Sequence, residues 1–324
     1  MADPKIKIAL VGLGNMGKNH YRVLQSNSDF EIVAIVDANK DAIAGHKDLP
    51  PFYTDYKALS DVTFDAAVIA APTEHHFDIT KFLLDLGKPT LVEKPLAHTP
   101  EKARELAAYA EEKNVLLAVG HVERANPAVR KLKEVIERGW LGDPIHYNFT
   151  RVGGYPSNVK KGNNVLLDLA VHDLDILNFL EGEFQVKASV CHKSIQADIP
   201  DTAEILLFKE GGSSANIHVN WITPTKIRTL RVTGTKGVCF VDYMLQTCVL
   251  WGGNLLNGNP GREFDYKDLQ THYRNSDKIE FGVAQEEPLK VQLKEFYKAL
   301  QGEEHALCLA PQGANVVELA QKAF

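Results

Sequence analysis

The first 120 residues alternate short runs of apolar residues with segments whose apolar residues recur at helical spacing. The apolar runs predict six strands, at 6–11, 32–36, 52–54, 66–71, 89–93 and 115–119. The segments between them predict helices at 18–25, 41–47, 56–60, 74–86 and 100–113. Strands that alternate with helices are joined by crossover connections, so the pattern indicates a doubly wound parallel sheet.

The second half of the chain has a different pattern. Helices are expected at 126–138 and 165–180, and consecutive strands at 145–152, 185–192, 202–209, 213–221, 227–234, 237–243 and 247–251. Short turns join most of these strands, which favours antiparallel pairing. The sequence predicts a loop at 252–265 and terminal helices at 288–300 and 312–324. We therefore expect an α/β chain in two parts: residues 1–122, with the parallel sheet, and residues 123–324, an α+β domain with a large open, mostly antiparallel sheet.

A glycine-rich turn follows the first predicted strand. It runs Gly12-Leu13-Gly14-Asn15-Met16-Gly17 and opens the first predicted helix. In such a turn the first glycine permits the bend, the second lets the backbone approach a pyrophosphate, and the third allows close packing of helix on strand. Asp37 ends the second strand 20 residues after Gly17, the spacing expected of a carboxylate that binds the adenosine ribose. The turn and Asp37 predict a Rossmann dinucleotide site, with Asn15 and Met16 also at the cofactor.

Two further segments follow strands at the edge where ligands bind in doubly wound sheets. Glu93-Lys94-Pro95 closes the fifth strand, and a lysine there can hold a hydroxyl and stabilise an alkoxide. A solvated lysine at a strand end is the alternative. Ala71 and Thr73 follow the fourth strand, with His76 just beyond. Thr73 and His76 are expected either to contact the cofactor's second ribose or to be a helix cap and a helix-surface residue.

Asp168 and His172 form the second chemical pair. They are four residues apart in a predicted helix, so they share one face, where the carboxylate can orient the imidazole as a base. A surface pair of little energetic value is the alternative, but the neighbouring residues are apolar. Asp173 and Asp175 are expected to be solvated or capping residues. Other predicted substrate contacts are Glu123, Arg124 and Asn126, for which ordinary hinge chemistry near 120–126 is the alternative. Arg151 and Tyr155 are expected at the lip of the substrate site.

Composition excludes several classes of protein. The net charge of −6 and the absence of a basic cluster argue against nucleic acid as a partner, and no apolar run is long enough to span a bilayer. The first strand begins within a few residues of Met1, which predicts a chain without a signal peptide. Four scattered cysteines fit a reducing cytoplasm, and no metal-ligand spacing is present. We expect a cytoplasmic protein.

These motifs together resemble the Gfo/Idh/MocA oxidoreductases. The resemblance rests on Gly12-x-Gly14-x-x-Gly17, Glu93-Lys94-Pro95 and Asp168-x-x-x-His172 and covers essentially the whole chain. It implies an N-terminal Rossmann domain that binds NAD, and a C-terminal domain whose open sheet packs in homodimers or homotetramers. It also implies that Lys94 and His172 contact a small-molecule sugar at the reacting carbinol, with Asp168 as the supporting acid.

A narrower resemblance is to the UDP-N-acetylglucosamine 3-dehydrogenases of that family. It rests on the segments 120–129, 151–156 and 221–228, with Ala125 and Gly154 as departures from the expected residues. It implies NAD-dependent oxidation of C3 of a UDP-sugar. The alternatives are a UDP-N-acetylglucosaminuronate 3-dehydrogenase, an inositol or free-sugar dehydrogenase, and a sensor that binds dinucleotide without catalysis.

Overall fold

The chain divides into two compact units in a computed structural model that describes residues 4–43, 49–156, 164–252 and 278–324. The first unit comprises residues 1–124 and 287–321, and the second 125–286 and 322–324. The predicted boundary at 122 lies two residues from the observed one. The C-terminal helices, expected in the second domain, instead pack with the first. Periodicity identified these helices but carried no information about which sheet they cover.

The first unit is a seven-stranded sheet in the order β15-β6-β5-β4-β1-β2-β3. Its strands are β1 (Ile6–Val11), β2 (Phe30–Val36), β3 (Phe52–Tyr53), β4 (Ala66–Ile69), β5 (Thr90–Glu93), β6 (Leu117–Gly120) and β15 (Cys308–Leu309). The first six run parallel, as predicted, whereas β15 pairs antiparallel with β6. A strand of two residues has no periodicity to detect, so β15 was not expected.

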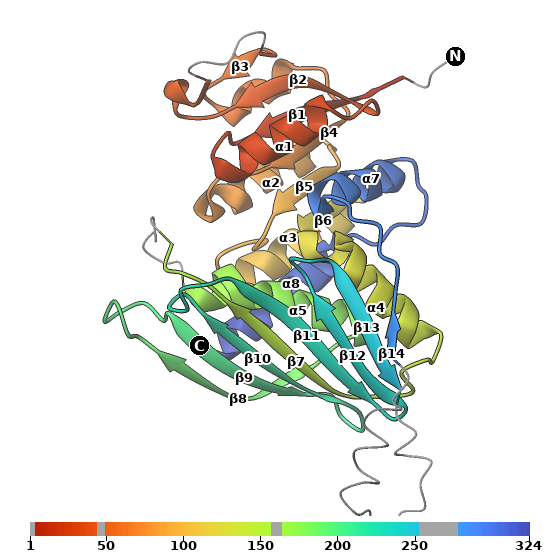
Figure 1. The fold of residues 1–324 in the computed structure, drawn as a ribbon. Helices are drawn as coiled ribbons and strands as arrows, with labels where there is room; N and C mark the ends of the chain where they lie inside the picture. The colour runs from red at the N-terminus through yellow and green to blue at the C-terminus, as the bar shows by residue number, and fades with distance from the viewer. Residues whose placement is uncertain (1–3, 44–48, 157–163, 253–277) are drawn as a thin grey trace, which may run out of the picture. The chain divides into compact units, whose positions relative to one another are not determined.

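Helices cover both faces of this sheet (Figure 1). Alternate residues of β1 point to opposite sides: Ile8 and Leu10 join a core with α1 and α7, while Ala9 and Val11 join a core with α2, α3 and α8. The helices are α1 (Asn15–Gln25), α2 (His76–Asp85), α3 (Pro100–Lys113), α7 (Pro288–Leu300) and α8 (Ala310–Lys322). The predicted helix at 41–47 is a 3₁₀ turn over Lys40–Ile43, and the rest of it lies outside the described residues.

The second unit is built on an eight-stranded sheet in the order β14-β13-β12-β11-β7-β10-β9-β8. Only β7 and β10 pair in parallel, so the sheet is mostly antiparallel, as predicted. The strands are β7 (Pro144–Val152), β8 (Gln185–His192), β9 (Thr202–Phe208), β10 (Ser214–Asn220), β11 (Ile227–Gly234), β12 (Gly237–Asp242), β13 (Thr247–Gly252) and β14 (Lys278–Glu280). Nearly all of the predicted loop at 252–265 lies outside the described residues.

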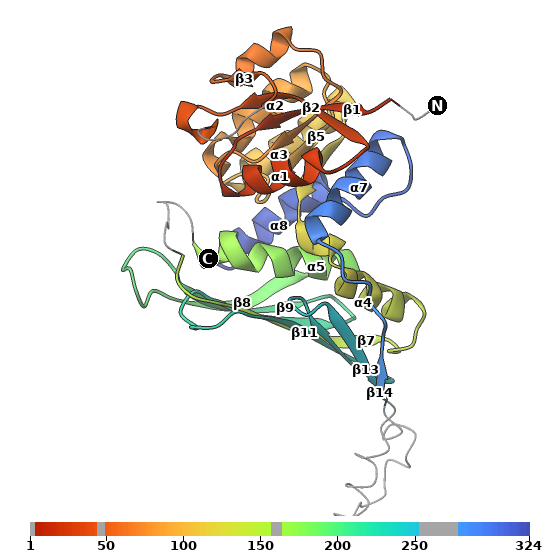
Figure 2. The same ribbon diagram turned by 45° about the horizontal axis from the view of Figure 1, so that its top comes forward.

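Helices α4 (Pro127–Glu137) and α5 (Val171–Glu181) lie on one face of this sheet (Figure 2). No helix of the described segments covers the opposite face. On that face Leu206 and Phe240 are 44% exposed, because each alternates with buried residues of its own strand. Within the described parts of the chain, no helix is both long and apolar enough to cross a membrane.

Two glycines fix the entry into α1. At Gly12 the backbone φ is +95°, and a Cβ would lie 2.5 Å from the nitrogen of Ala71. At Gly17 a Cβ would lie 2.1 Å from the carbonyl oxygen of Gly12. At Gly14, by contrast, a Cβ would meet no heavy atom within 4 Å.

This difference predicts the stability of two alanine variants. Gly17→Ala must push α1 away from the turn, so it should lower the free energy of unfolding by about 2–3 kcal/mol. Gly14→Ala should change it by less than about 0.5 kcal/mol, because the new methyl group enters open space. Urea unfolding followed by circular dichroism compares them, and equal stabilities would contradict the packing argument.

Candidate functional site

The N-terminus of α1 forms a cradle at the carboxyl end of β1. Gly14 caps the helix with an extended backbone, and Asn15 and Met16 in its first turn are exposed. Since the space beside Gly14 is empty and the first N–H groups of a helix lack intrahelical partners, the cradle fits a pyrophosphate.

Asp37 lies directly after β2 with its carboxylate held by two backbone N–H groups. Leu13 of the glycine-rich turn donates to Oδ2 at 2.7 Å, and Asn39 donates to Oδ1 at 2.8 Å. Each oxygen has a further lone pair for a ribose hydroxyl. The turn and the acidic residue that the sequence predicted are therefore joined by a hydrogen bond.

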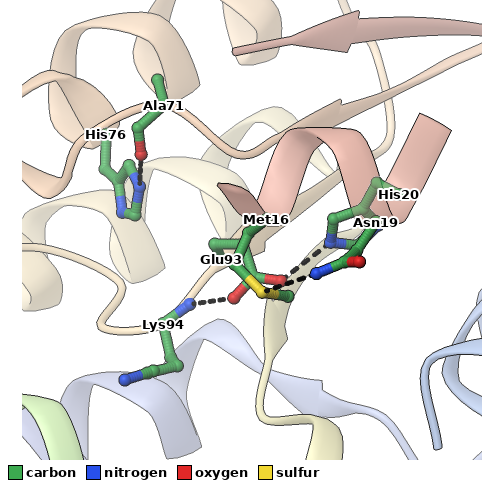
Figure 3. Close-up of polar contacts among 7 residues, drawn as sticks. All are labelled: Met16, Asn19, His20, Ala71, His76, Glu93 and Lys94. Carbon is green, nitrogen blue, oxygen red and sulfur yellow. Dashed lines mark hydrogen bonds and ion pairs between the residues drawn. The ribbon is translucent and has the colours of Figure 1, made fainter. Parts of the chain in front are cut away.

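A buried pair connects α1 with the end of β5 (Figure 3). His20 Nε2 lies 2.8 Å from Glu93 Oε1, and both residues are buried. The N–H of Lys94 donates to Glu93 Oε2 at 3.3 Å, while the side chain of Lys94 extends away from the carboxylate. A side chain at Gly120 would crowd the carboxylate, because a Cβ there would lie 3.2 Å from the carboxyl group of Glu93.

His76 bridges two carbonyl groups at the same edge of the sheet. Its Nδ1 lies 2.9 Å from the oxygen of Pro95, and its Nε2 lies 2.9 Å from the oxygen of Ala71; Figure 3 shows the contact with Ala71. Burial lowers the pKa of His76, so the neutral ring donates to one carbonyl at a time. His76 is thus a buried tie between two loops and not a helix-surface residue, while Thr73 begins the 3₁₀ turn before α2. The Lys94–Pro95 peptide bond is cis.

In the second unit, Asp168 lies in a π-helical turn, Leu166–Ala170, that leads into α5. The predicted single α-helix over 165–180 is therefore two elements, and π turns often occur at functional sites. The indole N–H of Trp221 donates to Asp168 Oδ2 at 3.2 Å. The ring of Tyr155 packs edge-on against Trp221, with centroids 5.7 Å apart. Since His172 lies in the first turn of α5, which follows the π turn directly, Asp168, His172 and this aromatic pair belong to one region of the second unit.

A buried ion pair joins β7 to α5. Arg151 Nε and Nη2 donate to Asp173 Oδ1 at 3.0 and 2.9 Å, and Arg151 lies over the ring of Tyr243. Asp173 and Asp175 are 1% and 0% exposed, so the expectation that they are solvated is wrong. The sequence could not show the burial of Asp173, because its partner Arg151 lies on β7, a separate element.

The predicted substrate contacts near 123–126 are buried. Arg124 donates to Gln312 Oε1 at 2.9 Å in the first unit. The side chain of Asn126 accepts from the N–H of Ala128 as a helix cap and donates to the carbonyl of Tyr243 at 3.1 Å. Glu123 is 7% exposed. Arg124, Asn126 and Arg151 thus bind other groups of the protein. A role of these residues and of Glu123 in binding a substrate stays a prediction.

Two site residues were missed by sequence reasoning. His20 lies one helical turn beyond Met16, but nothing in the sequence connects it with Glu93, 73 residues later. Trp221 was expected only as the last residue of the strand at 213–221. The predicted residues fall in both units: Lys94 and the cradle in the first, Asp168 and His172 in the second.

Family models match both halves of the chain. Residues 6–121 match an oxidoreductase family with an NAD-binding Rossmann fold, and residues 129–239 match the Gfo/Idh/MocA C-terminal domain. The chain is 23% identical over 320 residues to UDP-N-acetylglucosamine 3-dehydrogenase of Acidithiobacillus ferrooxidans, covering 97% of this chain and 95% of that protein. It is 27% identical to scyllo-inositol 2-dehydrogenase (NAD(+)) of Bacillus subtilis, covering 85% and 83%.

Solved structures share the fold over nearly the whole chain. The Acidithiobacillus ferrooxidans enzyme superposes with a TM-score of 0.81 at 21% identity, covering 99% of this chain and 97% of that one. A levoglucosan dehydrogenase in complex with NADH gives 0.82 at 19% identity, covering 99% and 97%. At these identities the likeness establishes the fold alone. Together with the cradle and Asp37, the two matching family models show that this chain belongs to the Gfo/Idh/MocA family of oxidoreductases and has its NAD-binding Rossmann domain.

Proposed function

We propose that this protein oxidises a secondary hydroxyl of a sugar, and that the substrate is a nucleotide sugar, with C3 of UDP-N-acetylglucosamine as the reacting carbon. The choice of substrate rests on the similarity to a UDP-N-acetylglucosamine 3-dehydrogenase, which extends over 97% of this chain at 23% identity. The inositol dehydrogenases are the second candidate class, because one of them is 27% identical.

In the proposed mechanism two side chains act on the hydroxyl. The chemistry that bound NAD would supply is that of a hydride acceptor for the carbinol carbon. The ammonium group of Lys94 donates a hydrogen bond to the hydroxyl oxygen and stabilises the negative charge that develops there. His172 takes the hydroxyl proton on its imidazole. Asp168 supports His172 as the base, and Trp221 holds the Asp168 carboxylate through the indole N–H.

Tyr155 is proposed as a substrate-binding residue. Its hydroxyl is buried and has no hydrogen-bond partner in the described segments, while its ring is held by Trp221. A buried polar atom without a partner is unfavourable, and a hydroxyl or carbonyl of the sugar would satisfy it.

The sugar assignment is tested by NADH formation with free sugars, inositols and UDP-linked sugars, in the presence of a carbonyl trap. We expect absorbance at the NADH band with UDP-N-acetylglucosamine. Lys94→Ala should lower kcat by about 10²–10⁴-fold and leave the Kd for NAD within about threefold. Turnover of inositols alone would show that the protein is an inositol dehydrogenase, the second candidate. NAD binding without turnover of any sugar would favour a sensor.

A hydroxyl deletion tests the role of Tyr155. Tyr155→Phe should raise KM for the sugar about 5- to 50-fold, because one hydrogen bond to the substrate is lost. The melting temperature should stay within about 2 °C, since the ring contact with Trp221 remains. An unchanged KM would show that the hydroxyl does not reach the substrate.

We also propose that the open face of the second sheet joins this chain to a second copy, as a homodimer or as part of a homotetramer. Leu206 and Phe240 are large apolar side chains on that face, which no described helix covers. Such faces mark association surfaces. The Glu204–His218 ion pair lies on the same face, because Glu204 is two residues from Leu206 on β9 and is the cross-strand partner of His218.

The double variant Leu206→Glu with Phe240→Glu should dissociate the assembly, because it places four charges in an apolar dimer interface. Light scattering after gel filtration should report a smaller mass than for the wild type. Ile195→Glu, at an exposed position between β8 and β9, is the control and should keep the wild-type mass. A monomeric wild type would refute the proposal.

A further inference from the structure

The His20–Glu93 pair places a carboxylate inside the first unit. The Nε2–Oε1 distance is 2.8 Å, and the two side chains are 1% and 9% exposed. Burial alone raises the pKa of Glu93, but the hydrogen bond and the electrostatic attraction of His20, with the ammonium group and the N–H of Lys94, outweigh it, so the pKa lies below its ordinary value. Glu93 is therefore ionised at neutral pH.

The other nitrogen of His20 indicates the charge of the pair. Nδ1 is buried and has no hydrogen-bond partner within the described ranges. A protonated ring would place an unsatisfied N–H there, which is more costly than an unsatisfied lone pair. The favoured state has a neutral ring that donates from Nε2 to an ionised Glu93. The pair then carries one negative charge.

The strand order shows which part of a dinucleotide lies near this charge. The sheet runs β3-β2-β1-β4-β5-β6, so the direction of winding reverses between β1 and β4, where a dinucleotide crosses. Asp37 at the end of β2 marks the adenosine side. Glu93 is the last residue of β5, on the opposite side, and His20 is one helical turn from the cradle. The carboxylate thus belongs to the nicotinamide half of the site.

We propose that the Glu93 carboxylate, held by His20, makes this protein discriminate between the two redox states of its cofactor in favour of NAD⁺. The nicotinamide ring is positively charged when oxidised and neutral when reduced, so a nearby buried anion attracts only the oxidised form. Glu93 therefore tightens the binding of NAD⁺ relative to NADH and lowers the reduction potential of the bound couple. The inference concerns the cofactor alone and goes beyond the proposed sugar chemistry.

Equilibrium binding of NAD⁺ and of NADH to the full chain tests the proposal, with no sugar present. We expect Glu93→Gln to lower the ratio Kd(NADH)/Kd(NAD⁺) about tenfold, which is about 30 mV in the potential of the bound couple. Glu93→Asp keeps the charge and should keep the ratio within about threefold, even if both affinities fall. Glu105→Gln, an exposed carboxylate on α3, is the matched control and should leave the ratio unchanged.

Equal weakening of both forms by Glu93→Gln would show that Glu93 only positions the cofactor, and would overturn the proposal. His20→Gln keeps a neutral donor and should leave the ratio unchanged. A tenfold rise in that variant would reveal a charged His20 and a neutral pair, which also overturns it. If Glu93→Gln does not fold, the wild type decides: the proposal requires NAD⁺ to bind more tightly than NADH. Failure of the sugar panel would not affect any of these outcomes.

Discussion

The contact between the glycine-rich turn and its neighbours is the constraint on which the cofactor half depends. Gly12 lies against the backbone of Ala70 and Ala71, and Gly17 lies against the carbonyl of Gly12, so no side chain fits at either position. This contact sets the direction of α1. As a result, the same helix presents its N-terminus as a cradle and brings His20 to Glu93, at the end of a strand far along the chain.

The second unit places its polar residues by pairing them inside an apolar core. Arg151 and Asp173 satisfy one another, and the indole of Trp221 satisfies an oxygen of Asp168. Because an unpaired buried charge is very unfavourable, each of these contacts restricts its partner to one position. The π turn widens the helix at Asp168, and α5 follows with His172 in its first turn. A side chain on such a support has a fixed position, as a preorganised site requires.

Motifs with local geometry were predictable from the sequence. The glycine spacing and Asp37 identified the dinucleotide site, because the turn, the helix and the strand that form it are contiguous in the chain. The strand alternation identified the parallel sheet, and the run of consecutive strands identified the mostly antiparallel one. Residues whose partners are remote were not predictable. Nothing in the sequence indicated that Arg151 binds Asp173 or that Arg124 binds Gln312.

The sequence by itself determined the order of the elements, the cofactor motif and the chemical groups available for catalysis, because these depend on residues that are near neighbours along the chain. Only the tertiary structure decided that the C-terminal helices pack on the first sheet, that His20 holds Glu93, and that Trp221 holds Asp168. The physical reason is that burial and hydrogen bonding act on side chains that meet in space. No local pattern records which distant residue will satisfy a buried charge.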